Sequence, residues 1–206
     1  MKARYVEYGG KLSIVCAVCI LGVAGAYLKA KDRIAEGQSA VFREAIREVL
    51  GLPAGGPEPR VVNEEAAVEE QVFVAELAGE KRYATQGAHR GYSGLVVLAV
   101  GARLAEGKLS ILDARVIRQT ETPGLGTRIA ERETNLTLWS NLGRVLGREV
   151  REETDWFFLK RLRGRGIDEL SPADVAAVKI TGVTISTNAA VEAARKALSR
   201  IREVIE

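Results

Sequence analysis

Residues 95–119, LVVLAVGARLAEGKLSILDARVIRQ, decide the fold of this chain. The first ten, LVVLAVGARL, are apolar and rich in valine, which is typical of a buried β-strand. Residues 106–108 (EGK) supply a turn, and the residues after them partly alternate between apolar and polar. The inward-facing candidates there are Leu109, Ile111, Ala114 and Val116. Together the two runs predict an antiparallel hairpin.

The flanking segments predict helices and further strands. Residues 72–77 are a candidate strand, and residues 155–162 are another because WFFL favours β-structure. Apolar residues recur at helical spacing in residues 34–50, 136–146 and 189–205, and SPAD at 171–174 is typical of a helix start. The last helix has a stripe of Val191, Ala194, Leu198, Ile201 and Ile205. We expect an α+β fold, a small and mostly antiparallel sheet with helices packed on it.

The N-terminal segment predicts one transmembrane helix. Residues 12–28, LSIVCAVCILGVAGAYL, carry no charge, and they would form a helix about 25 Å long. Such a run is long enough for a short membrane span, which Lys11 and Lys29 would bracket. The alternative is a cleaved signal peptide, with small residues at 24–26 as the cleavage site. We therefore expect an anchor at 1–33, a connecting helix and Gly/Pro-rich linker at 34–60, and a functional domain at 61–206.

Composition excludes several classes of function. Of the 206 residues, 30 are Lys or Arg and 27 are Asp or Glu, which gives a formal net charge of +3. This small net charge and the lack of a block of Lys and Arg residues argue against nucleic-acid binding. His89 is the only histidine, and no metal site of the His/Cys kind is expected. Cys16 and Cys19 fit as small hydrophobic residues in a membrane helix, with a redox or metal pair as the alternative. No catalytic residues are predicted, since nothing resembles a nucleophilic triad.

The first segment that could bind a ligand is Glu121–Gly126, ETPGLG. Proline restricts one backbone angle there and the two glycines permit positive φ, which predicts a preshaped loop with exposed N–H groups. An ordinary Gly/Pro turn is the alternative. A dinucleotide fingerprint is excluded because Ile129 occupies the place of the third glycine.

The second segment is Thr181–Thr187, TGVTIST, which directly precedes the last helix. It offers four hydroxyl groups in seven residues, and hydroxyls with free N–H groups at a helix start suit an anion. A phosphate near Ser186 would be well placed. Plain capping of the helix by Thr187 or Asn188 is the alternative.

Both segments together, in this order, resemble the FMN-bearing G subunit of the Rnf electron-transport complex and the related C subunit of the sodium-translocating NADH:quinone reductase. ETPGLG matches the family loop without change, and residues 181–186 align with its S/T-G-A-T-x-S/T motif. Residues 90–94 (RGYSG) and the hairpin resemble the family's G-Y-x-G segment. The N-terminal anchor fits as well, so the resemblance covers most of the chain.

The resemblance implies FMN as the cofactor, bound covalently through a phosphoester at Ser186. It implies that Thr184 orients the phosphate linker, that Thr122 hydrogen-bonds the ring, and that Leu125 and Gly126 lie against the ring face. Trp139 would shield the ring, with a place in the core beside the helix stripe as the alternative. The full set of expected cofactor-binding residues is Ser186, Thr184, Thr181, Gly182, Glu121, Thr122, Leu125, Gly126, Trp139 and Tyr92.

The implied function is electron transport in a membrane flavoprotein. The chain would be one component of an ion-translocating ferredoxin/NAD oxidoreductase, a translocase, rather than a self-contained enzyme. Its partners would be other membrane subunits, including flavin and iron–sulfur subunits. It would cross the cytoplasmic (inner) membrane once, with the FMN domain on the outer (periplasmic or extracellular) face. The flavin phosphoester would make it a phosphoprotein.

The sequence departs from the family at Val178, where the attaching flavin transferase usually reads an acid, and at Val183 and Ser186 within the motif. Serine keeps the nucleophilic oxygen, but the lost acid would weaken recognition by the transferase, so FMN binding is expected even where covalent attachment fails. Two alternatives remain: a degenerate structural subunit of the same complex without covalent FMN, and an unrelated secreted binding domain.

Overall fold

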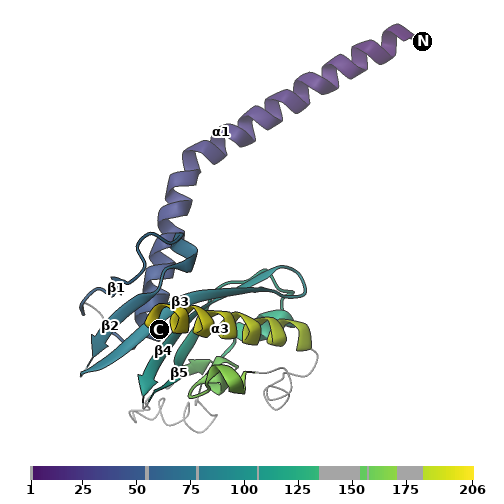
Figure 1. Cartoon of the computed structure of the whole chain (residues 1–206). Coiled ribbons are helices and arrows are strands. Elements are labelled where there is room, and N and C mark those ends of the chain that lie inside the picture. The colour runs from purple at the N-terminus through teal and green to yellow at the C-terminus, as the bar shows by residue number, and fades with distance from the viewer. Residues whose placement is uncertain are drawn as a thin grey trace, which may run out of the picture. The chain divides into compact units, whose positions relative to one another are not determined.

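The computed structural model describes residues 2–53, 56–77, 79–105, 107–134, 154–156, 158–170 and 183–206. Within these residues lie helix α1 (Lys2–Val49), helix α3 (Thr184–Ile205) and five strands of one sheet (Figure 1). The strands are β1 (Arg60–Val61), β2 (Phe73–Leu77), β3 (Glu80–Arg90), β4 (Leu95–Ala105) and β5 (Lys108–Arg118). A separate two-stranded sheet pairs β6 (Arg132–Thr134) with β7 (Thr154–Trp156). Short 3₁₀ turns are η1 (Val68–Glu70), η2 (Gly126–Ala130), η3 (Leu159–Leu162) and η4 (Ile167–Glu169).

The five-stranded sheet is an antiparallel meander in the order β1-β2-β3-β4-β5. The predicted hairpin is confirmed as β4 and β5, which pair from Val97↔Arg118 to Ala105↔Lys108. Gly107 takes a φ of 75° in the connecting turn, where a residue with a side chain would be strained. A register shift between Gly101 and Ala102 explains why the polar and apolar residues of β5 alternate only partly.

Helix α3 covers one face of this sheet and lies across β3 and β4 (Figure 1). Its predicted stripe is confirmed: Val191, Ala194, Leu198 and Ile201 are buried, and Ile205 packs partly buried against the same core. The helix can approach closely because Gly87 of β3 has no side chain. A Cβ there would lie 1.9 Å from the carbonyl oxygen of Ala193.

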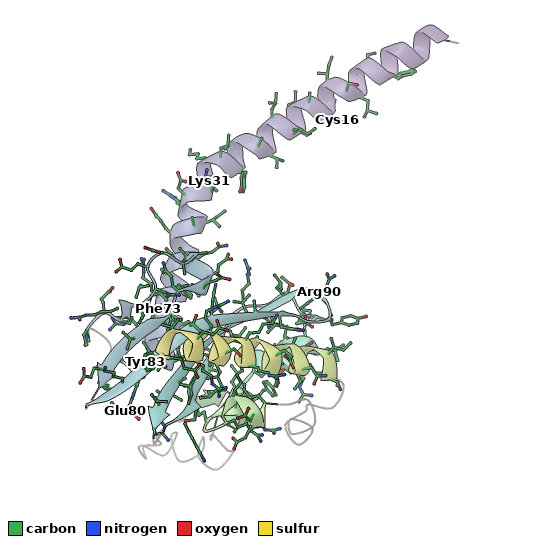
Figure 2. The ribbon with its side chains drawn as sticks, viewed as in Figure 1. Cys16, Lys31, Phe73, Glu80, Tyr83 and Arg90 are labelled. Atoms are coloured by element: carbon green, nitrogen blue, oxygen red, sulfur yellow. The ribbon has the colours of Figure 1, made fainter. Side chains whose placement is uncertain are left out.

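The opposite face of the sheet is covered by the last turns of α1. Ala45, Ile46, Val49 and Leu50 are buried against Phe73, Ala84 and Ala99 in a second core cluster. The rings of Phe42 and Phe73, the latter labelled in Figure 2, meet edge to face at 5.7 Å. With helices on both faces, β4 is buried on both sides, which is the reason for its continuous apolar sequence.

The chain divides into two compact units, residues 1–41 and 42–206. The first unit contains one segment long and apolar enough to cross a membrane. Its apolar side chains, such as Leu12 and Leu21, are exposed, and so are the free thiols of Cys16 and Cys19 (Cys16 is labelled in Figure 2). The α+β fold with one candidate transmembrane helix is thus confirmed, while the boundaries at 33/34 and 60/61 remain predictions.

Four predicted elements differ from the structure or lie outside the described residues. The strand predicted at 155–162 is wrong for residues 158–162: Phe158 is buried outside any strand, and residues 159–162 form a 3₁₀ turn that buries Leu159 and Leu162. The final helix begins at Thr184 rather than 189, so its first turn carries the hydroxyl motif. The predicted helix at 136–146 and the helix start at 171–174 lie outside the described residues.

Candidate functional site

The ETPGLG loop begins three residues after the end of β5 and leads directly into η2. Gly124 has a φ of 75°, and its N–H donates to Thr127 Oγ1 at 3.0 Å. The N–H of Leu125 donates to the carbonyl of Thr122, which closes the turn. Ile129 of η2 is fully buried in the core beneath α3. The loop is therefore fixed at both ends, by a sheet strand and by a buried side chain.

Helix α3 brings the second predicted segment to the same place. Val183 precedes the helix without a side-chain cap, and the first helical bond of this turn joins the N–H of Thr187 to the carbonyl of Val183. The N-terminus of a 22-residue helix carries a partial positive charge and N–H groups that favour an anion. Ser186 lies in this first turn and is only 3% exposed.

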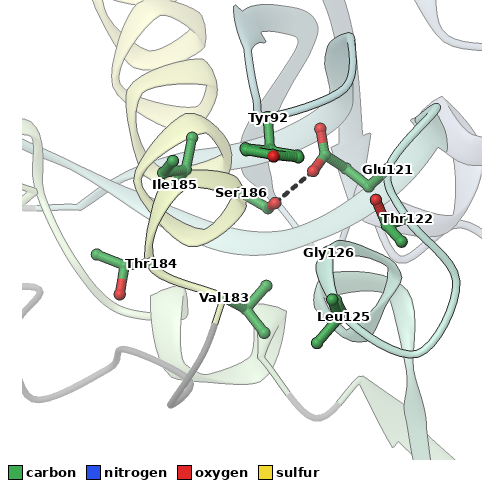
Figure 3. Close-up of a pocket in the computed structure, with 9 residues that line it drawn as sticks. All are labelled: Tyr92, Glu121, Thr122, Leu125, Gly126, Val183, Thr184, Ile185 and Ser186. Carbon is green, nitrogen blue, oxygen red and sulfur yellow. Dashed lines mark hydrogen bonds between the residues drawn. The ribbon is translucent and has the colours of Figure 1, made fainter.

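A hydrogen bond joins the two segments across 65 residues of sequence. The hydroxyl of Ser186 donates to Glu121 Oε2 at 2.5 Å (Figure 3). Both side chains are buried, with Glu121 5% exposed. Hydrogen bonds from hydroxyl groups to carboxylates are about 2.5–2.7 Å long and roughly twice as strong as neutral ones. The contact therefore fixes the position of the hydroxyl that the sequence singled out.

The carboxylate of Glu121 is held in place by groups on a third segment, between β3 and β4. The backbone N–H of Ser93 donates to Glu121 Oε1 at 3.2 Å. Gly91 leaves room for that oxygen, since a Cβ there would lie 2.3 Å from it. Gly126 does the same for Oε2, since a Cβ there would lie 2.4 Å away. Two glycines and one backbone donor thus make a close-fitting seat for one carboxylate.

A cavity of about 390 Å³ opens beside this pair. This volume lies within the range of about 300–1,000 Å³ common for small-molecule sites. The lining residues, all labelled in Figure 3, are Tyr92, Glu121, Thr122, Leu125, Gly126, Val183, Thr184, Ile185 and Ser186. Tyr92 is 71% exposed, and Leu125 and Ile185 are each 54% exposed, so large apolar surfaces border the cavity.

Seven of the ten residues predicted to bind a cofactor line this one cavity: Ser186, Thr184, Glu121, Thr122, Leu125, Gly126 and Tyr92. The other three, Thr181, Gly182 and Trp139, lie outside the described residues. Sequence reasoning did not identify the backbone of Ser93 as a partner of Glu121. The nearby RGYSG segment was the only signal, since two glycines flanking a tyrosine and a serine predict a tight backbone.

The cavity suits FMN, which has a phosphate, a chain of hydroxyl groups and a flat ring. The hydroxyl of Ser186 and the start of α3 suit the phosphate. Thr122 and Thr184 offer hydroxyl groups on the cavity wall, and the exposed apolar faces of Tyr92, Leu125 and Ile185 suit a ring. Among the described residues no group of three or more His, Cys, Asp or Glu side chains could hold a metal ion.

Comparisons with known proteins agree with this geometry. A family model described as "FMN-binding domain" matches residues 91–199, which include the seat of Glu121, the ETPGLG loop and most of α3. The chain is also similar to the G subunit of the ion-translocating oxidoreductase complex of Haemophilus influenzae (strain PittEE). The two are 33% identical over 140 residues, covering 64% of this chain and 66% of the relative's length. The resemblance inferred from the motifs is thereby confirmed, and the chain belongs to the FMN-binding domain family.

Proposed function

We propose that this protein is a membrane-anchored, FMN-carrying electron-transfer subunit of an ion-translocating oxidoreductase complex, with the flavin phosphate esterified to Ser186 Oγ. Membership of the FMN-binding family and similarity to the G subunit of such a complex support the coarser part of this proposal. The single observation that carries the finer part is the position of the Ser186 hydroxyl. It lies in the first turn of α3 and on the wall of the cavity.

Six residues of the cavity wall have a role in this proposal. Ser186 holds the phosphate, and the N-terminus of α3 stabilises its negative charge by about 0.3–1 kcal/mol. Thr184 and Thr122 offer hydrogen bonds to the phosphate linker and the ring, while Tyr92, Leu125 and Gly126 border the ring. Thr181 and Gly182 complete the attachment motif, and Trp139 shields the ring. When bound, FMN supplies the electron-carrying chemistry, and the protein orients it and sets its surroundings.

The N-terminal helix fits a membrane anchor in this proposal. Exposed apolar side chains along residues 12–28 would be unfavourable in water but favourable in a bilayer. The chain would cross the cytoplasmic membrane once, with its FMN domain on the outer face. Its partners would be the other membrane subunits of the complex, including flavin and iron–sulfur subunits that pass electrons to it.

The test is to purify the full chain from cells that contain a flavin transferase and to examine it under denaturing conditions. We expect yellow protein whose fluorescence survives in a denaturing gel and whose intact mass includes one FMN. Ser186→Ala should lose this label, whereas Ser199→Ala, on the same helix and outside the cavity lining, should keep it. A label that persists in Ser186→Ala would overturn the attachment site. Unlabelled wild-type protein within an intact complex would favour the structural subunit without covalent FMN.

A further inference from the structure

The hydroxyl at the attachment point has a carboxylate as its hydrogen-bond acceptor. We propose that Glu121 is the general base that takes the proton of Ser186 Oγ when the flavin phosphate is attached. This inference rests on the proposed attachment at Ser186. It assigns a chemical role to an acidic residue that lies 65 positions upstream of the hydroxyl.

The geometry is that of an activated nucleophile. A serine hydroxyl is a weak nucleophile until a neighbouring base removes its proton, and the two groups must lie within hydrogen-bonding distance. Here Ser186 Oγ and Glu121 Oε2 are 2.5 Å apart, with the hydroxyl as donor. Because Ser186 also lines the cavity, a phosphoryl group entering the cavity can reach the same oxygen.

The two oxygens of Glu121 have different tasks. Oε1 accepts the backbone N–H of Ser93, which orients the carboxylate. Oε2 accepts the hydroxyl of Ser186 and is the oxygen available for the proton. Gly91 and Gly126 border the carboxylate closely, since a Cβ at either position would come within 2.4 Å of a carboxylate oxygen. A main-chain donor thus orients the base independently of Ser186.

The attachment reaction balances with this assignment. It needs a donor whose FMN phosphate is activated as an anhydride, and a flavin dinucleotide with a pyrophosphate linkage is of that chemical class. The bond from Ser186 Oγ to phosphorus forms while the anhydride P–O bond breaks, and a nucleoside monophosphate leaves as the anion. The proton of Ser186 moves to Glu121 Oε2, and no atom changes its oxidation state.

Glu121→Gln separates this role from a purely structural one. The amide has nearly the same shape and can still hydrogen-bond both Ser93 and Ser186, but it is not basic. General bases contribute about 10²- to 10⁴-fold to rates. We therefore expect the rate of covalent labelling by flavin adenine dinucleotide and a flavin transferase to fall by about that factor. Circular dichroism of Glu121→Gln checks that the variant is folded, so that slow labelling is not the result of an unfolded chain.

The matched control is Glu131→Gln, which removes the same charge from the end of η2. Glu131 is exposed, pairs with Arg128 at 3.5 Å and does not line the cavity, so its variant should label at the wild-type rate. Normal labelling of Glu121→Gln beside labelled wild type would overturn the assignment and leave the proposed function standing. Failure of wild type to label at Ser186 would overturn both.

A second variant tests the same role if Glu121→Gln fails to fold. Glu121→Ala vacates the seat between Gly91 and Gly126, and formate is a carboxylate small enough to occupy it. We expect formate to restore labelling of Glu121→Ala at least tenfold, while chloride at equal ionic strength does not. Equal labelling of Glu121→Ala with formate and with chloride would contradict the role of the carboxylate as the base.

Discussion

Gly126 is the position at which a single methyl group should disturb the site most directly. A Cβ there would lie 2.4 Å from Glu121 Oε2, 2.6 Å from Glu121 Cβ and 2.7 Å from Ser186 Oγ. Contacts this short cannot persist, so in Gly126→Ala the carboxylate and the hydroxyl must move apart or η2 must shift. Overpacking of this kind costs about 1–3 kcal/mol.

That energy can be converted into two measurable effects. For a domain of this size, 1 kcal/mol lowers Tm by about 2–4 °C, so Gly126→Ala should lower Tm by about 2–12 °C. If the strain must be relieved before Ser186 reaches its labelling geometry, the labelling rate falls by about 5- to 150-fold, because 1.4 kcal/mol is a factor of ten. Thermal unfolding by circular dichroism and intact-mass time courses measure the two.

Gly124→Ala is the matched control in the same loop. Gly124 has a φ of 75°, but nothing lies within 4 Å of a Cβ built there. The alanine would be strained by its left-handed backbone, at about 1–2 kcal/mol, without contacting the site. We expect a similar loss in Tm with labelling close to wild type. Equal labelling rates for the two variants would refute the argument that Gly126 protects the contact between Glu121 and Ser186.

Three further predictions concern the fold. Gly87→Ala places a Cβ 1.9 Å from the carbonyl oxygen of Ala193, a backbone atom that cannot rotate away. We expect the free energy of unfolding in urea to fall by about 3 kcal/mol or more, and a fall under about 1 kcal/mol would contradict close packing of α3 on β3. Thr85→Val removes the buried hydroxyl that donates to the carbonyl of Gln71 at 2.7 Å. The variant should lower the free energy of unfolding by about 1–3 kcal/mol, whereas unchanged stability would show that water replaces the hydroxyl. Residues 42–206 expressed alone should fold and stay soluble without detergent, and aggregation in size-exclusion chromatography would show that they need residues 1–41.

Much of the sheet could be predicted because its pattern is local. The hairpin of β4 and β5 follows from two apolar runs around a Gly-containing turn, and β2 lies where valine and phenylalanine recur. Strand β3 escaped prediction because its sequence, EKRYATQGAHR, is polar and has a glycine in the middle. It is a strand because β2 and β4 supply hydrogen-bonding partners on both sides. Its glycine, which weakens strand propensity, is required for the approach of α3.

The end of the chain shows a similar contrast. The apolar stripe from Val191 onward predicts a helix from its spacing alone. Residues 184–187 (TIST) are rich in β-branched residues, and their sequence does not predict a helix. Burial of Ser186 and Thr187 against the rest of the domain extends the helix through these residues. The segment WFFL was predicted as a strand from propensity, but packing into the core places Phe158 and Leu159 outside any strand.

The sequence by itself determined the α+β class, the apolar N-terminal helix and the two motifs that meet at the site, because each is encoded in a short run of residues. Tertiary structure alone decided how the motifs are used. The contact between Glu121 and Ser186 depends on three tertiary features. These are the pairing of β4 with β5 as far as Arg118, the close approach of α3 to Gly87, and the hydrogen bond from the backbone of Ser93. A hydrogen bond of 2.5 Å between side chains 65 residues apart requires all of these to be in place, and no local pattern specifies that distance.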